Sequence, residues 1–227
     1  MSDRANRGGG QTAKTDRLPR LLVVLAFTGL ALAQPEPKDF RQTTWGMTKA
    51  QVVAAEATKP AAVTESNGEV IVRYDSVPFA HLDAQVVYIL ARDRLVRAKF
   101  LFSAEHADAN DFIGDYKNVE PLLLGQYGKP ADSRAIWEDD STQLEPKSYL
   151  DQDRASPANI LTSDAQVGLA VSLGHMRMFT QWDCPRTTIL HALTGRNHHI
   201  THQIEYRSVE WSALEQEVRP VGTKPAL

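Results

Sequence analysis

The residues of this chain whose types and spacing come closest to a site of chemistry are histidines. His198 and His202 lie four positions apart in a segment of alternating residues, and His191 lies in the segment before it. Imidazole is a common zinc ligand, but zinc needs three or four ligands at about 2 Å. Positions four apart on one strand are separated by about 13 Å, so His191 or another group would have to bridge them. We therefore take His191, His198 and His202 as candidate metal ligands.

A second interpretation of these histidines stays open. His198 and His202 share a predicted strand face with Ile200, Ile204 and Tyr206. On that face they can pack beneath a helix as part of the core, with no metal.

One serine lies in a pattern related to a hydrolase motif. Ala170 to Gly174 is an A-x-S-x-G variant of the nucleophile elbow, centred on Ser172. The elbow needs a strand before the serine and a helix after it. Here a helical segment comes first and a strand follows, so the match does not predict a nucleophile.

Carboxylates cluster in a polar stretch, 138–163, at Glu138-Asp139-Asp140 and at Asp151 and Asp153. Paired carboxylates can hydrolyse glycosides or hold calcium, but the EF-hand spacing is absent. We interpret the stretch as a long, mobile, solvated acidic loop, and whether it is functional stays open.

Motifs for phosphate, dinucleotide, zinc-protease and dithiol chemistry are absent from the sequence. The only cysteine, Cys184, precedes Pro185 and is interpreted as a turn residue; one thiol cannot form an intramolecular disulfide. We therefore assign no catalytic and no cofactor-binding residue, and expect no cofactor.

The elements that position these residues follow from changes in hydrophobic period. A capping box at Thr48 and Gln51 predicts a short helix over about 49–58. A second helix is predicted over 109–127, ending at Gly128, with a kink or break at Pro121. Alternating apolar residues predict strands at 70–74, 82–90 and 96–102, with a turn at Arg92-Asp93.

A short strand is predicted at 133–137, at the end of the first half. In the C-terminal half, a helix at 164–173 precedes three strands, at 176–182, 187–194 and 198–207. Gly195-Arg196-Asn197 predicts a tight hairpin between the last two, and Ser208 caps a terminal amphipathic helix. Hairpin-length connections between strands indicate an α+β fold: an antiparallel sheet packed by short helices, not alternating βαβ units.

The first 33 residues have the composition of an export signal. Leu21 to Ala33 are thirteen uncharged residues that follow five basic side chains and end in Ala-Leu-Ala. A helix of that length rises only about 20 Å, short of a bilayer core of about 30 Å, and no lipid-attachment cysteine follows. We expect cleavage after Ala33, a periplasmic or secreted location, and no stable membrane anchor afterwards.

Cleavage would change the net charge and set the domain limits. It removes five basic and two acidic side chains, so the formal net charge moves from −3 to −6, which disfavours nucleic-acid binding. We divide the chain into a signal (1–33), an exported α+β domain (34–207) with candidate halves 38–137 and 160–207, and a terminal helix with a flexible tail (208–227).

Several short motifs carry a resemblance to an uncharacterised family of exported bacterial domains: Phe40-Arg41, Trp45-Gly46-Met47-Thr48 with Gln51-Val52, Tyr127-Gly128-Lys129-Pro130 with Trp137, and Gly174-His175 with Trp182. More loosely, they resemble the helix-helix-sheet modules of β-lactamase-inhibitor proteins and of small outer-membrane-assembly lipoproteins. The resemblance covers about residues 40–207 and implies an architecture more than an activity. It does not carry over the lipid anchor of those lipoproteins.

Two functional hypotheses follow. The first is a non-enzymatic exported domain that binds a protein or an envelope component through an exposed sheet face or the acidic loop. The second is a small metal-binding protein or metal-dependent hydrolase that uses His191, His198 and His202.

Overall fold

The computed structural model describes residues 38–138 and 164–218. The expected signal segment, the flexible tail and all but the first residue of the acidic loop lie outside the described residues. Everything that follows concerns the described part of the chain.

One antiparallel sheet of eight strands organises the domain, in the order β1-β2-β3-β4-β8-β7-β6-β5. Each half of the chain forms a four-stranded meander, and the two meanders join where β4 pairs with β8. The strands are β1 (Ala62–Ser66), β2 (Glu69–Phe79), β3 (Leu82–Ala91), β4 (Arg94–Phe102), β5 (Asp132–Trp137), β6 (Met176–Asp183), β7 (Thr187–Arg196) and β8 (His199–Ser208). The predicted α+β class with an antiparallel sheet is confirmed.

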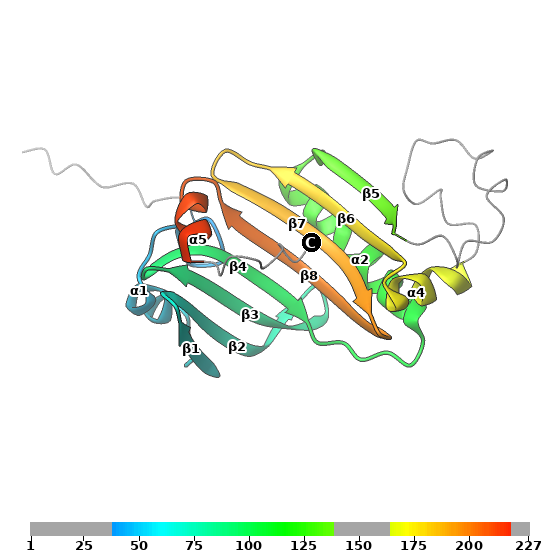
Figure 1. The fold of residues 1–227 in the computed structure, drawn as a ribbon, viewed down its shortest axis with the longest axis horizontal. Helices are drawn as coiled ribbons and strands as arrows, with labels where there is room; N and C mark the ends of the chain where they lie inside the picture. Colours follow the sequence, from blue (N-terminus) through cyan, green and yellow to red (C-terminus); the bar gives the residue numbers. More distant parts are fainter. Residues whose placement is uncertain (1–37, 139–163, 219–227) are drawn as a thin grey trace, which may run out of the picture. The chain divides into compact units, whose positions relative to one another are not determined.

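The described residues form four helices beside the sheet: α1 (Lys49–Ala55), α2 (Ala109–Tyr127), α4 (Asp164–Leu173) and α5 (Ser212–Val218). Helices α2 and α4 pack against each other and cover one face of β6, β7 and β8, behind the strands in Figure 1. Helix α5 lies on the viewer's side of the sheet, against β3 and β4. Apart from α5, no described helix covers that face. We call this face of the sheet, including the area next to α5, the helix-free face.

The core fills the space between the sheet and α1, α2 and α4. Alternate residues of each strand point to this side, because side chains on a strand alternate between faces. One buried cluster extends over β2, β3, β4 and β8 and includes Val86, Tyr88, Phe100 and Ile204. A second lies beneath α2 and α4 and includes Ile113 and Leu193.

Most predicted elements are observed, with several differences. A kink or a break was expected at Pro121, and the break is wrong, because helix α2 continues through this residue. The apolar stripe of the helix holds it on the sheet despite the missing amide donor. Strand β1, whose side chains are largely exposed, had not been predicted. Strand β5 pairs with β6, which groups it with the second meander although the candidate halves placed it in the first.

The hairpin between β7 and β8 turns one position later than the sequence predicted. Arg196 pairs with His199, and the turn residues are Asn197 and His198, with φ of 52° and 64°. Two positive φ values in a two-residue loop define a type I′ turn, whose twist matches that of the strands. His198 therefore belongs to the turn and not to the face of β8.

Glycines mark where α4 approaches other elements most closely. A Cβ built on Gly168 would lie 2.4 Å from the backbone carbon of Ala109 at the start of α2. A Cβ on Gly195 of β7 would lie 2.0 Å from the carbonyl oxygen of Val171. By contrast, a Cβ on Gly114, at an exposed position of α2, meets nothing within 4 Å.

We expect Gly168→Ala and Gly114→Ala to change stability in opposite directions. The first forces α2 and α4 apart and should cost about 1–3 kcal/mol. The second adds a good helix former without a clash and should stabilise by about 0.5–1 kcal/mol. Urea unfolding of both variants measures the two changes, and equal effects would show that the helix crossing is not as tight as described.

Candidate functional site

The structure brings two of the three candidate histidines together. His191 of β7 and His202 of β8 are buried, and their Nε2 atoms lie 2.8 Å apart, so that one ring donates to the other. Tyr116 of α2 stacks on His191, with ring centroids 3.9 Å apart and planes inclined by 7°. Phe102 of β4 packs on His202 at 4.2 Å. The pair is therefore enclosed by rings from the helix and from a neighbouring strand.

The third candidate does not join this pair. His198 is exposed in the β7–β8 turn, four positions along the chain from His202, where a strand would place it about 13 Å away. In the part of the chain that is described, no group of three His, Cys, Asp or Glu side chains could hold a metal ion. Two imidazoles alone fall short of the three or four ligands that zinc requires.

The surroundings of the pair keep it uncharged. Burial lowers the pKa of His202 to about 3 and, with the adjacent His202, lowers that of His191 well below its ordinary value. The groups around the pair are uncharged: the rings of Tyr116 and Phe102, and the Thr180 hydroxyl that lies 3.0 Å from the Tyr116 hydroxyl. The hydroxyl of Thr180 donates in turn to the carboxylate of Glu120. Glu120 makes no hydrogen bond to either imidazole, and the two imidazoles bond to each other.

The other candidate residues have structural surroundings. Ser172 lies inside α4 and its hydroxyl donates to the carbonyl of Leu169 at 2.8 Å, with a strand after the helix, as the sequence indicated. Cys184 lies between β6 and β7, and burial raises the pKa of its thiol, which opposes formation of the nucleophilic thiolate. Glu138 pairs with Arg177 at 2.9 Å; the remaining carboxylates of the acidic loop lie outside the described residues.

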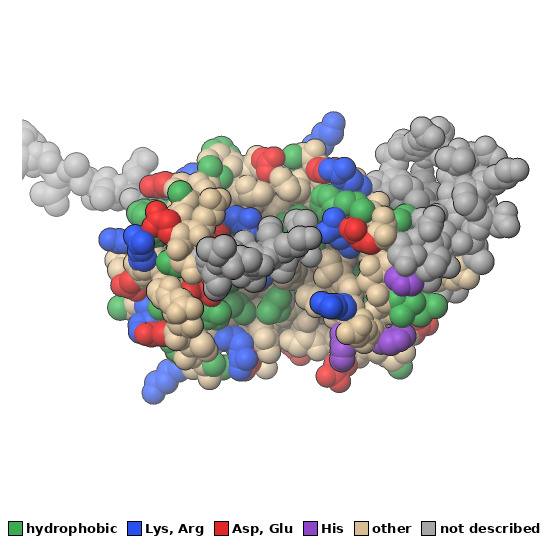
Figure 2. Space-filling view, in the orientation of Figure 1, with side chains coloured by type: hydrophobic (Ala, Val, Ile, Leu, Met, Phe, Trp, Pro, Cys, Tyr) green, Lys and Arg blue, Asp and Glu red, His purple; other side chains and the backbone are tan. Residues whose placement is uncertain are grey.

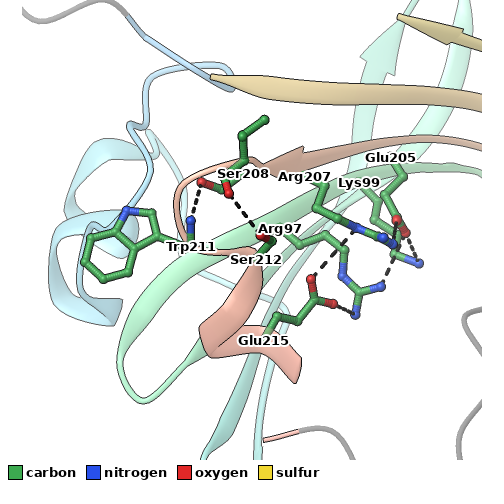
Figure 3. A network of polar contacts seen from close by, with 9 residues as sticks. Arg97, Lys99, Glu205, Arg207, Ser208, Trp211, Ser212 and Glu215 are labelled. Atoms are coloured by element: carbon green, nitrogen blue, oxygen red, sulfur yellow. Dashed lines mark hydrogen bonds and ion pairs between the residues drawn. The ribbon is translucent and has the colours of Figure 1, made fainter. Parts of the chain in front are cut away.

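A network of charges lies on the helix-free face where β4 meets β8 (Figure 3). The Glu205 carboxylate is buried and contacts Lys99 at 2.9 Å, Arg207 at 2.6 Å and Arg97 at 3.5 Å. Glu215 of α5 contacts Arg97 at 3.1 Å and Arg207 at 3.8 Å. These contacts attach α5 to the sheet through charge-assisted hydrogen bonds.

The balance of charge explains why a carboxylate can be buried here. Burial by itself would raise the pKa of Glu205, but Lys99, Arg97 and Arg207 together outweigh it and lower the pKa. Alternation places Arg97 and Lys99 on one face of β4, and Glu205 and Arg207 on one face of β8. The sequence alone does not show that these two complementary faces are neighbours.

Farther along the helix-free face, β5, β6 and β7 form a shallow groove of about 180 Å³. Its apolar walls include Phe179 and Leu190, and Arg134 and Arg177 also line it. The Arg134 guanidinium lies 5.5 Å from the centre of the Phe179 ring and also pairs with Asp132. Figure 2 shows basic, acidic and apolar side chains interspersed on this side of the molecule. We call the hollow between β5, β6 and β7 the sheet groove.

Comparisons with protein-family models, with curated proteins and with solved structures find no match to this chain. The described helices include none that is both long and apolar enough to cross a membrane. The fold and the site therefore define an α+β domain with a buried histidine pair and a charged, partly apolar sheet face.

We expect the histidine pair to make stability depend on pH in a mildly acidic window. The folded-state pKa of His202 is about 3, whereas an unfolded histidine titrates near 6.5. The unfolded state therefore binds more protons below about pH 6.5, and stability falls as pH decreases. For His202 alone the loss should reach about 2–3 kcal/mol at pH 4.5, measured by urea unfolding between pH 7.5 and 4.5.

A double variant, His191→Leu with His202→Leu, should lose this slope between pH 6.5 and 4.5, because no imidazole remains to be protonated on unfolding. Ile204→Val is the matched control, since Ile204 pairs with His191 and adds no titrating group. It should lower stability by about 1 kcal/mol at every pH. A slope unchanged in the double variant would contradict the assignment.

Proposed function

We propose that this chain is an exported, non-enzymatic domain that binds a protein or another component of the cell envelope through its helix-free face. The export part of the proposal rests on the composition of residues 1–33. The binding part rests on the sheet groove. We place the domain in the periplasm or outside the cell.

The sheet groove has the chemistry of a protein-binding surface. Its volume of about 180 Å³ is close to that of a cavity of about 150 Å³ that holds a benzene ring, so it can receive one aromatic or branched side chain. Arginine and aromatic residues are enriched where interfaces gain most of their affinity, and Arg134 lies over Phe179 in this way.

The ion pairs at the groove can exchange their partners. The side chains of Arg134 and Asp132 are 60% and 35% exposed, and those of Arg177 and Glu138 are 29% and 50% exposed. Exposed pairs of this kind contribute about 0–1 kcal/mol. A partner carboxylate can therefore replace Asp132 or Glu138 at little cost, while Glu205, buried among three cations, is held in place.

Charge reversal in the groove tests this proposal. The variant Arg134→Glu with Arg177→Glu should reduce recovery of partners from a native envelope extract by more than about tenfold, because it repels partner carboxylates and removes the arginine contacts. Lys59→Glu with Lys129→Glu is the control, since both lysines are exposed, lie outside the groove and change the net charge equally.

A second variant separates the groove from the acidic loop. Deleting residues 140–160 should leave recovery unchanged if the groove is the binding surface. Recovery that depends on the deletion and not on the arginines would move the site to the loop. Equal recovery with all variants would contradict both versions.

The metal-dependent alternative, with His191, His198 and His202 as ligands, has less support from the geometry. It requires His198 to leave the β7–β8 turn and approach a buried pair. Elemental analysis of the purified protein tests it directly: we expect no stoichiometric zinc or other transition metal, and one metal ion per chain that is lost in His202→Leu would overturn this expectation.

A further inference from the structure

On the helix side of the sheet, near the C-terminal end of α2, the domain has two adjoining hollows of about 340 and 270 Å³. They share the lining residues Lys38, Asp39 and Tyr127. The larger is within the range of small-molecule pockets, about 300–1,000 Å³, and the sheet groove is smaller. We call the two hollows together the aromatic cleft.

Five aromatic rings from separate parts of the fold line the larger hollow: Phe40 before α1, Phe79 of β2, Phe100 of β4, Tyr127 of α2 and Tyr206 of β8. The rings fix one another. Ring centroids lie 4.9 Å apart for Phe40 and Tyr206, 5.1 Å for Phe40 and Phe100, and 4.7 Å for Phe79 and Phe100. Such contacts give the cleft preformed apolar walls.

The polar groups at the cleft are mostly cationic. Lys38, Arg41 and Arg186 line it, against one carboxylate, Asp39. Asp39 accepts from Arg186 and from the backbone amide of Trp45, both at 2.9 Å. The bond to Asp39 occupies one terminal nitrogen of Arg186, and a guanidinium carries five N–H donors, so donors remain for a ligand.

Arg41 and Lys38 add to this positive potential from the other side. Arg41 is bound to Glu56 through Nε at 2.9 Å and one terminal nitrogen at 3.0 Å, and it has a positive φ of 50° in the turn that joins Phe40 to Thr43. The exposed ammonium of Lys38 has no ion pair with any residue that the structure describes. Lys38 lines both hollows, so its charge lies at the cleft.

The cleft also offers a hydroxyl donor at its apolar wall. The Tyr127 hydroxyl donates to the Tyr206 hydroxyl at 3.4 Å. The Tyr206 hydroxyl accepts in this bond, so its own O–H is not used in it.

We propose that the aromatic cleft binds a small organic anion with an aromatic or similarly flat apolar body. The rings take the apolar body, and Lys38, Arg41 and Arg186 surround the anionic group at the opening. A cationic ligand would meet three like charges, of which Asp39 and Glu56 compensate two, and the remaining positive charge opposes the cation–π recognition that aromatic walls otherwise permit. This site is separate from the sheet groove, which lies on the opposite face.

A matched pair of probes tests both the pocket and the sign of its charge. 8-Anilino-1-naphthalenesulfonate and N-phenyl-1-naphthylamine share an aromatic body and differ in the sulfonate group. Titration of the purified protein, followed by probe fluorescence, should show one saturable site for the anion and at least about tenfold weaker binding of the neutral probe. Equal affinities would overturn the anionic assignment, and no saturable binding would overturn the site.

Three variants locate the bound probe. Gln126→Trp places a large ring at the exposed edge of the cleft and should abolish the site for both probes. Lys38→Glu should weaken the anion by about three- to tenfold without affecting the neutral probe. Lys59→Glu makes the same charge change at an exposed position outside the cleft and should leave both unchanged.

Far-ultraviolet circular dichroism and melting temperature verify that each variant folds. Anion binding that persists in both Gln126→Trp and Lys38→Glu would place the probe elsewhere and overturn the proposal. Loss of the probe in Arg134→Glu with Arg177→Glu, with binding intact in the cleft variants, would do the same by assigning it to the sheet groove.

Discussion

The pairing of β4 with β8 is the contact on which the rest of this domain depends. It joins residues 97–101 to residues 203–207 in antiparallel register and so converts two four-stranded meanders into one sheet. A meander of this size has a free edge, which exposes unpaired backbone donors and acceptors. Each meander supplies the partner for the other at this edge, and only the outer strands β1 and β5 remain as edges of the sheet.

The same pairing gives the two faces of the sheet different chemistry. Alternation along β4 and β8 places Phe100, Ile204 and Tyr206 on the helix side, and Lys99 and Glu205 on the other. The first set builds the core and the wall of the aromatic cleft, and the second builds the ion network. A shift of register by one residue would exchange the faces, leaving charges in the core, so the network and the core specify one register together.

Local features of the fold could be predicted from the sequence, and long-range features could not. Alternation in 96–102 and the apolar stripe of 109–127 depend on residues close in the chain, and both elements are observed, although α2 continues through Pro121 without the expected break. Strand β1 has four exposed positions of five and therefore carries little apolar signal. The pairing of β4 with β8 joins residues about a hundred positions apart in the chain. The sequence shows that the two segments carry complementary charges, but it does not show that these two strands are neighbours.

The candidate site shows the same division. Alternation correctly placed His202 on a buried face with Ile204 and Tyr206, but His198 was assigned to that face because the position of the hairpin turn was one residue in error. His191 and His202 meet through the β7–β8 register, which pairs His191 with Ile204 and Leu193 with His202, and so brings the two rings into contact diagonally.

The ion network around Glu205 and the pair of His191 and His202 are both buried polar clusters, and they are stabilised in different ways. Glu205 keeps its charge, because Lys99, Arg97 and Arg207 compensate for the loss of water. The histidines have no cationic or anionic partner among the residues that the structure describes and are held neutral by burial; within the same residues, the Nδ1 atom of each has no hydrogen-bond partner. An unpartnered buried nitrogen costs about 1–3 kcal/mol, and the aromatic contacts of Tyr116 and Phe102 offset part of that cost. Protonation of a histidine would destabilise the fold more than the unpartnered nitrogen does, because the buried positive charge would meet only rings and hydroxyls. The helix side therefore accommodates an uncharged histidine pair, while on the helix-free face the buried Glu205 keeps its charge because Lys99, Arg97 and Arg207 surround it.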